Sequence, residues 1–153
     1  MGRRTGGMAM GANLNLGGAR SALLLTSRLL GAALTGAMGW IHLWLWVDGF
    51  REVPVIGTLF LINAIGAGLL VAALLVVPVR LRSAVAAVTA VFTAGTLLGL
   101  ILSLTVGLFG SQETLQTPLV PTTLIVESAG VLVLVFTAIL GGRAERMSPT
   151  DRI

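Results

Sequence analysis

The chain has 153 residues, of which 56% are hydrophobic and 10% are charged, and its mean hydropathy is +0.98. Soluble domains carry about 25% charged residues, so this composition excludes an ordinary water-soluble globular protein. The net charge of +4 comes from arginine alone, since lysine is absent. Cysteine is absent too, which excludes a disulfide framework, a thiolate metal site and a cysteine nucleophile.

Residues 1–20 are rich in glycine, include three arginines and show no apolar periodicity. This composition predicts a flexible cytoplasmic tail ahead of the first apolar segment. That segment is too long for the apolar part of a secretory signal peptide, and no small-residue cleavage site follows it. We therefore expect it to remain in the protein as a helix.

The first membrane-spanning helix is predicted over about residues 21–47. Roughly 20 helical residues cross a bilayer core about 30 Å thick, and residues 29–47 contain no charged side chain. Gly31, Thr35 and Gly39 recur every four residues, which favours close contact with another helix. Tryptophans gather at the far end, where an aromatic belt at a membrane interface is the expected role and a ligand-stacking site the alternative. They are Trp40, Trp44 and Trp46.

Three further apolar segments predict spanning helices over about residues 55–77, 84–109 and 119–140. The loop at residues 48–54 is short, so the helices that flank it should be antiparallel neighbours. Asp48 and Arg51 are placed to pair within this loop.

Small residues also recur every four positions on the second and third helices, and we interpret both rows as surfaces for close helix contact. The rows are Ala64, Gly68 and Ala72 on the second helix, and Gly95, Gly99, Ser103 and Gly107 on the third. The pair Gly141 and Gly142 predicts the end of the fourth helix, followed by a cytoplasmic tail over residues 143–153. Together these segments predict an all-α, integral membrane four-helix bundle.

The arginines indicate how the bundle is oriented. Four lie on the N-terminal side, two in the linker at residues 78–83 and three in the C-terminal tail, against one, Arg51, in the two opposite loops. By the positive-inside rule, both termini should face the cytoplasm and the loops at residues 48–54 and 110–121 should face outward. Because the arginines lie at the ends of apolar segments and form no basic stripe, we expect no nucleic-acid partner. Arginine without lysine is also typical of GC-rich bacteria, so the expected location is a bacterial cytoplasmic (inner) membrane.

Four polar residues interrupt the apolar helices, one in each: His42, Asn63, Ser103 and Glu127. With a rise of about 1.5 Å per residue, each falls roughly 9–14 Å beneath the outward surface. We therefore expect them to gather in one buried polar pocket. The mouth of this pocket is expected at the charged residues of the outward loops, which are Asp48, Arg51, Glu52 and Glu113.

Glu127 is the most informative of the four, because an ionisable side chain within a membrane costs a few kcal/mol and usually faces the bundle interior or a wet cavity. Three interpretations stay open. Glu127 is an interhelical clamp with Thr123 and either His42 or Asn63, a proton or ligand site, or part of a metal site. One histidine with carboxylates is a small ligand set for zinc or copper, and haem held by two histidines is excluded.

Signatures of soluble enzymes are missing from the sequence. It has no phosphate-binding glycine loop with lysine, no HExxH pair and no GxSxG elbow. Ser103 or Ser128 could form a serine, histidine and acid set with His42 and Glu127, but only the residue types support this, since no motif accompanies them. We therefore predict no catalytic residues.

Two resemblances are carried by short motifs. Residues 28–31, Arg-Leu-Leu-Gly, followed by Gly36, Gly39 and His42, resemble the opening helix of the DoxX-like four-helix bacterial membrane proteins. The whole chain is similar to short actinobacterial membrane proteins with a Gly-Phe-Arg-x-x-Pro turn, here residues 49–54, and a Gly-Leu-Phe-Gly-x-x-Glu segment, here residues 107–113. The DoxX-like resemblance implies redox or quinone-linked membrane partners, whereas the second resemblance implies no established activity.

These observations lead to two functional hypotheses. The first is a non-catalytic accessory or assembly subunit of a larger inner-membrane complex, such as a respiratory one. It follows from the small size, the absence of a catalytic set and small-residue faces that a partner protein or a second copy would cover. The alternative is a small proton-linked carrier or a quinone-associated redox protein that uses the pocket of His42, Asn63 and Glu127. No cofactor is predicted, and the expected pocket ligand is a lipid or a quinone.

Overall fold

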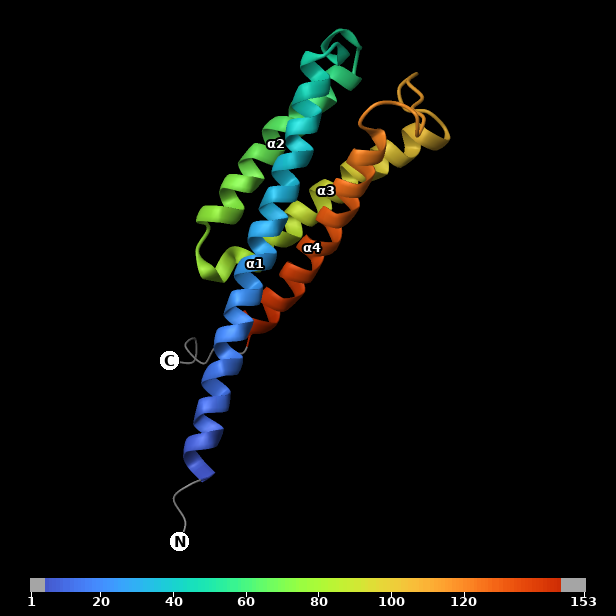
Figure 1. Ribbon diagram of the computed structural model, residues 1–153. Helices are drawn as coiled ribbons and strands as arrows, with labels where there is room; N and C mark the ends of the chain where they lie inside the picture. The colour runs from blue at the N-terminus through green and yellow to red at the C-terminus, as the bar shows by residue number, and fades with distance from the viewer. Residues whose placement is uncertain (1–4, 147–153) are drawn as a thin grey trace.

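The structure is a computed structural model that describes residues 5–146, with side chains described for residues 17–143. Four long helices account for most of the chain: α1 (Thr5–Val47), α2 (Ile56–Val76), α3 (Arg82–Thr105) and α4 (Val120–Arg146) (Figure 1). Two short 3-10 helices, η1 (Phe50–Glu52) and η2 (Val79–Leu81), lie in the first two connections. The predicted all-α class is confirmed.

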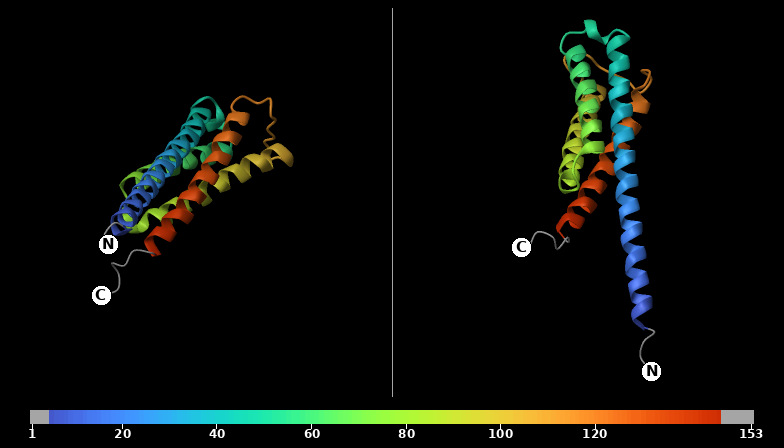
Figure 2. Two further views of the ribbon diagram at one scale, coloured as in Figure 1. Left: turned by 60° about the horizontal axis from the view of Figure 1, so that its bottom comes forward. Right: turned by 90° about the vertical axis from the view of Figure 1, so that its left-hand side faces the viewer.

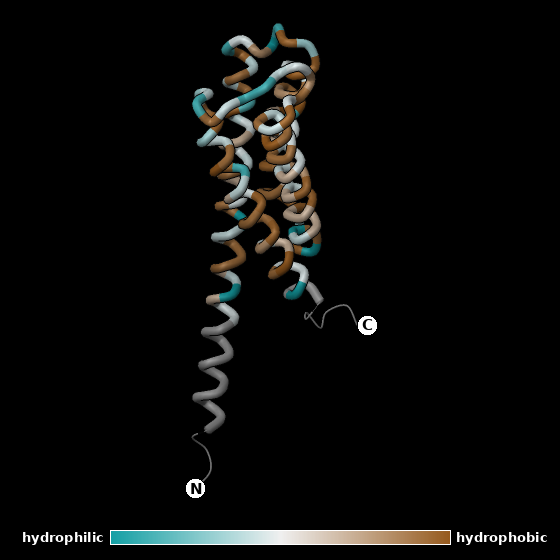
Figure 3. The backbone as a smooth tube through the Cα atoms, turned by 90° about the vertical axis from the view of Figure 1, so that its right-hand side faces the viewer, coloured by the Kyte–Doolittle hydropathy of each residue, from teal (hydrophilic) through white to brown (hydrophobic). Residues whose placement is uncertain are grey.

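Each long helix contains a segment that is long and apolar enough to cross a membrane. These segments are Gly17–Val47, Ile56–Val76, Val79–Thr105 and Val120–Arg143. Hydrophobic residues dominate the four helices between their ends (Figure 3). The four helices agree with the prediction of a multi-pass membrane protein.

The helices run antiparallel, with η1 and the connection at residues 106–119 at one end, called here the loop end, and η2 with both chain termini at the other, called the terminal end (Figures 1 and 2). Extensive contacts join α1 to α2, α1 to α4 and α3 to α4. In contrast, α2 and α3 contact each other far less. The bundle therefore has three closed seams and one that is largely open.

The packing is that of a protein surrounded by lipid. Large aliphatic side chains such as Leu69, Ile125 and Leu132 are exposed on the outside, whereas several threonines are buried inside. The buried threonines donate to backbone carbonyls of the preceding turn, as when Thr35 donates to Gly31 O over 2.8 Å. Small and polar residues therefore face the neighbouring helices, and the apolar surface faces outward.

The predicted small-residue face of α1 is used in two of the closed seams. A Cβ atom at Gly31 would lie 2.8 Å from Leu134 Cδ2 of α4, and one at Gly39 would lie 2.6 Å from Ala67 Cβ of α2. Both separations are shorter than carbon atoms tolerate, so glycine at these positions allows α1 to approach both neighbours closely.

The first helix is longer than predicted. It begins at Thr5, so residues 5–20 are helical and do not form the predicted flexible tail. No proline interrupts this stretch, and extending an existing helix adds one hydrogen bond for each residue fixed. With 43 residues, α1 is roughly 65 Å long, and its N-terminal part projects beyond the other three helices (Figure 2). Residues 1–4 of the predicted tail lie outside the described residues.

The fourth helix also runs past its predicted end. It continues through Gly141 and Gly142 to Arg146, because Gly141 packs against Ser83 of α3 and so serves a helix contact there. Residues 143–146 of the predicted C-terminal tail are therefore helical, and the rest of that tail lies outside the described residues.

The third helix ends at Thr105, earlier than predicted, because Gly107 adopts a φ of +81° and leaves the helical path. Leu108 and Ser111 then pair around Phe109 and Gly110, which both have positive φ as a two-residue hairpin turn requires. After this turn, the N–H of Glu113 donates to Ser103 O over 3.2 Å. The connection is thus held back against the end of α3.

Candidate ligand-binding cavity

A cavity of about 460 Å³ occupies the loop-end half of the bundle. All four long helices, η1 and the connection at residues 106–119 contribute to its wall. The four residues predicted to form a buried pocket all line it, one from each helix, and each is buried. They are His42, Asn63, Ser103 and Glu127.

The charged residues predicted at the mouth of the pocket are only partly placed there. Glu113 lines the cavity, but Asp48, Arg51 and Glu52 do not. Arg51 pairs with Glu52, with 3.1 Å between Nε and Oε1, and does not pair with Asp48 as predicted. Arg51 and Glu52 are both exposed in η1, and it is Phe50 of the same turn that lines the cavity.

The cavity opens sideways, between α2 and α3. Leu59 and Ile62 on α2 and Val91 on α3 line it although their side chains are exposed. Towards the terminal end the gap closes, because the Phe92 ring lies against Gly66, where an added Cβ would be 2.8 Å from Cζ. In a bundle that crosses a bilayer, an opening between two helices faces the lipid acyl chains.

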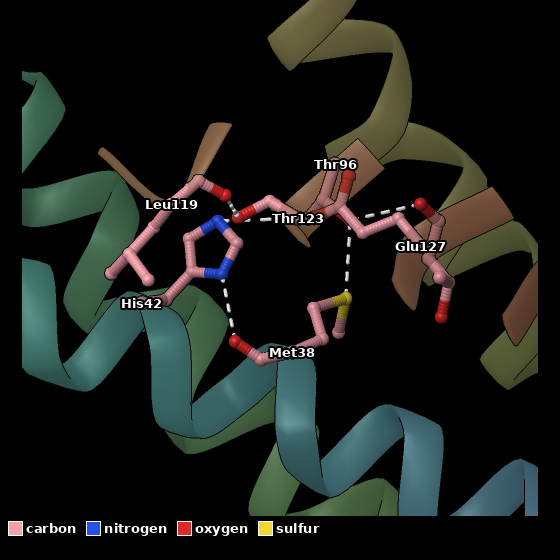
Figure 4. Close-up of polar contacts among 7 residues, drawn as sticks. Met38, His42, Thr96, Leu119, Thr123 and Glu127 are labelled. Atoms are coloured by element: carbon pink, nitrogen blue, oxygen red, sulfur yellow. Dashed lines mark hydrogen bonds and ion pairs between the residues drawn. The ribbon is translucent and has the colours of Figure 1, made fainter. Parts of the chain in front are cut away.

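Glu127 lies in the cavity wall, fully buried from solvent. Neither of its carboxylate oxygens has a hydrogen-bond partner in the described part of the chain. His42 Nε2 is 4.0 Å from Oε1, which is too far for a hydrogen bond (Figure 4). Thr96 lies beside Glu127, but its hydroxyl is already 2.8 Å from Thr93 O and 3.3 Å from Met38 Sδ. With the Thr96 hydroxyl directed to Thr93 O, the carboxyl group receives no hydrogen bond from the described residues.

His42 is held in one orientation. Its Nδ1 lies 2.9 Å from Met38 O, and because a carbonyl oxygen can only accept, Nδ1 donates. In the neutral ring this leaves Nε2, the nitrogen that faces Glu127, as an acceptor (Figure 4). The ring also packs edge-on against Phe60, with the centroids 5.1 Å apart.

Asn63 adds a further unmet acceptor to the cavity wall, because its Oδ1 is buried without a hydrogen-bond partner. The hydroxyl of Ser103 has a partner, Ser111 O, at 3.5 Å. The hydroxyl of Thr123 donates to Leu119 O, just ahead of α4, over 2.8 Å and so does not hold Glu127. Buried acceptors without protein donors favour a ligand or proton site over the interhelical clamp.

A metal site finds less support in this geometry. Among the described residues, no three histidine or acidic side chains come close enough to hold a metal ion together. Glu127 and His42 alone are fewer protein ligands than zinc sites use.

Several residues of the cavity were not predicted from the sequence. Gly95 and Gly99 belong to the row interpreted as a packing surface, yet they line the cavity, and nothing lies within 4 Å of an added Cβ at Gly95. Phe50, Phe60 and Phe92 supply its aromatic wall. A row of small residues beside a buried polar residue could have indicated a cavity. Phenylalanines in an apolar helix give no sequence signal that distinguishes a cavity wall from a packed core.

The tryptophans lie away from the cavity. Trp40 and Trp44 are exposed on the outside of α1, and neither they nor Trp46 line the cavity. Their position fits anchoring at a membrane interface better than contact with a cavity ligand.

The cavity thus combines a largely apolar wall, an opening towards lipid and a small group of buried acceptors. Such a site suits a lipid-soluble molecule with one polar group. Comparison of the chain with protein-family models, curated proteins and solved structures gave no match.

Proposed function

We propose that this protein binds a lipid-soluble small molecule within the membrane and acts as a small proton-linked carrier. The observation that carries the proposal is Glu127, fully buried in the wall of a 460 Å³ cavity with both oxygens unpaired in the described residues. An unsatisfied buried polar group costs about 1–3 kcal/mol, and more when it is charged. A ligand that bonds to Glu127 recovers this free energy, and the cavity volume is within the usual range for small-molecule sites.

The route to the cavity supports a lipid-soluble ligand. The opening lies between α2 and α3, where exposed apolar residues such as Ile62 and Val91 form its rim. A ligand dissolved in the bilayer reaches this rim without crossing the polar loops. A lipid or a quinone, the ligands expected from the sequence, both meet this requirement.

Two titratable side chains at the cavity support the link to protons. Glu127 and His42 come from different helices and lie 4.0 Å apart. A ligand that bonds to Glu127 competes there with a proton, and His42 Nε2 is the nearest acceptor for that proton. Binding of the ligand is then coupled to loss of the proton from Glu127, and release of the ligand to its return.

The arginine distribution supports the orientation within a bacterial cytoplasmic membrane. Arg28, Arg80, Arg82 and Arg143 lie at the terminal end, and Arg51 lies at the loop end. By the positive-inside rule, both termini lie in the cytoplasm and the cavity is in the outer half of the membrane.

A cavity-filling variant tests the binding function. Gly95→Leu places a side chain in the cavity where an added Cβ meets no atom within 4 Å, so it should fill the site without disturbing the helices. Gly68→Leu is the matched control, because Gly68 is equally open but does not line the cavity. Native mass spectrometry of protein extracted from membranes should find a small molecule on the wild type and on Gly68→Leu, and none on Gly95→Leu. Equal occupancy in all three proteins would contradict the proposal.

An accessory subunit of a membrane complex is the second candidate. It is favoured by the exposed Gly68 and Ala72 on α2, which belong to a small-residue row that the bundle does not fully cover. Such a row permits the close approach of a helix from a companion membrane protein. In mild detergent, a companion should co-purify with the wild type and Gly95→Leu but be lost from Gly68→Leu. A monodisperse protein without a companion in all three preparations would oppose this candidate. If the species that co-purifies is a second copy of the chain, the partner is the protein itself and the assembly is a homodimer.

A further inference from the structure

We infer that the ligand of the cavity is a lipophilic cation, an amphiphile whose positive charge lies beside Glu127 and whose apolar body lies between α2 and α3. This inference rests on the proposed binding function and names the chemical class of the ligand. Three features of the cavity support it: the kind of its unmet polar atoms, the charge of its wall and its aromatic residues.

The buried side-chain atoms of the described cavity wall that lack a hydrogen-bond partner are acceptors. They are both carboxylate oxygens of Glu127 and Oδ1 of Asn63. Nε2 of His42 is a fourth acceptor while the ring is neutral, because Nδ1 donates to Met38 O. A ligand that offers acceptors alone, such as a quinone carbonyl, satisfies none of these atoms with Glu127 ionised, whereas a positively charged group or its N–H donors can satisfy several.

The charged groups of the wall have the matching sign. Glu127 on α4 and Glu113 on the connection at residues 106–119 are its acidic residues, and His42 on α1 is its histidine. The residues that α2, α3 and η1 contribute to the described wall are uncharged, and no arginine lines it. Arg51, the arginine of η1, is exposed and paired with Glu52. A buried carboxylate in an apolar wall attracts a cation far more strongly than it would in water.

Aromatic rings line the same space. Phe60 packs against Phe50 with ring centroids 5.0 Å apart, and Phe92 lies on the opposite side of the opening, on α3. Ring faces attract cations, most strongly where water is excluded. The rings also provide apolar contact for the body of the ligand, and the side opening leaves room for a tail to extend into the bilayer.

Binding to the full chain in lipid nanodiscs tests this inference with matched probes. Tetraphenylphosphonium is a lipophilic cation, triphenylphosphine oxide has a similar body but is a neutral acceptor, and a short-tailed quinone represents the neutral redox ligands. We expect saturable binding of the cation, at least about tenfold tighter than binding of either neutral probe.

Charge-neutralising variants locate the effect. Glu127→Gln keeps the size of the side chain and should weaken cation binding by at least about tenfold. Glu52→Gln is the control, because Glu52 is exposed, paired with Arg51 and outside the cavity wall, and it should leave cation binding unchanged. If Glu127→Gln does not yield folded protein, Gly95→Leu, which retains Glu127, must abolish saturable cation binding.

The outcomes distinguish failure of the cationic ligand class from failure of the proposed binding function. Saturable binding of a neutral probe that Gly95→Leu abolishes, without binding of the cation, would overturn the cationic class and leave the cavity function intact. Equal effects of Glu127→Gln and Glu52→Gln on cation binding would also overturn it. If no probe binds and the small molecule found on membrane-extracted protein is unaffected by Gly95→Leu, the proposed function and the inference both fail.

Discussion

Glu127 is the residue whose surroundings define the site. Its neighbours Thr96 and Thr123 direct their hydroxyls to backbone carbonyls, and His42 approaches to 4.0 Å without a hydrogen bond. Because these hydroxyls have backbone partners, the polar groups of the cavity wall that need a partner outside the described residues are the carboxyl group of Glu127 and Oδ1 of Asn63.

The affinity for a lipophilic cation should fall as the pH falls. A proton on Glu127 removes the negative charge that attracts the cation, and a proton on His42 adds a positive charge 4.0 Å away. Glu113 is the other acidic residue of the wall, and the residues that α2 and α3 contribute are uncharged. Tetraphenylphosphonium titrations from about pH 5 to about pH 8 should therefore show weakening in acid. In Glu127→Gln the profile should be flatter, and an identical profile would contradict the role of this carboxyl group.

Val55 is strained at the start of α2. Its φ of 68° and ψ of −57°, with Ile56 N donating to Pro54 O over 2.8 Å, form a γ-turn of the rare hand, which is unfavourable for a β-branched residue. Such strain costs about 1–3 kcal/mol, whereas glycine costs about 0.4–1 kcal/mol through the unfolded chain. Val55→Gly should therefore leave the unfolding temperature unchanged or raise it.

The matched control for this prediction is Val53→Gly. Val53 has a φ of −84° and a ψ of 116°, an ordinary extended conformation, so glycine there brings the entropic cost without relief of strain. Thermal unfolding in detergent should show a lower midpoint for Val53→Gly than for Val55→Gly. The reverse order would show that the γ-turn is not strained.

At the scale of helices, the seams of the bundle depend on positions without a side chain. Gly39→Ala places a Cβ 2.6 Å from Ala67 Cβ, so α1 and α2 must separate. We expect a loss of about 1–3 kcal/mol in unfolding free energy, as for other overpacked interiors. Gly68→Ala on the open face of α2, with no atom within 4 Å of the added Cβ, should have no such effect. Equal stability of the two variants in detergent unfolding experiments would rule out this account of the seam.

The helices themselves could largely be predicted, because about 20 apolar residues between polar ends suffice to indicate a span. Their depths could be predicted as well, and since neighbouring helices are antiparallel, His42, Asn63 and Glu127 reach the same level. The facing of each helix could be predicted only in part, because small residues occur both on the sides that pack against other helices and on the side that lines the cavity. For the same reason Gly95 was assigned to a packing surface, although it lies in the wall of a hollow.

Helix ends and loop contacts were harder to predict than the spans. The start of α1 at Thr5 depends on the absence of proline, and the continuation of α4 past Gly142 depends on the contact of Gly141 with Ser83. Both override the preference of glycine for helix ends. The pairing of Arg51 with Glu52 depends on the turn of η1, whose form is decided by contact with α2: a Cβ at Gly57 would overlap Phe50 O.

At the scale of the whole molecule, the orientation can be tested directly because the chain contains no cysteine. A cysteine introduced at Gln112, in the exposed connection at the loop end, should react with a membrane-impermeant maleimide on intact cells. One introduced at Val79, exposed in η2 at the terminal end, should react only after the membrane is permeabilised. The opposite pattern would place both termini outside the cytoplasm.

The opening between α2 and α3 also determines which concentration controls occupancy. For a molecule that enters from among the acyl chains, occupancy of the site depends on the concentration of that molecule in the bilayer. Partitioning sets this concentration, so the aqueous concentration acts only indirectly. Diluting the protein with extra phospholipid at a fixed total amount of ligand should therefore reduce its saturation. Two hosts that receive the same total amount of ligand but differ in membrane area would then load the protein to different extents.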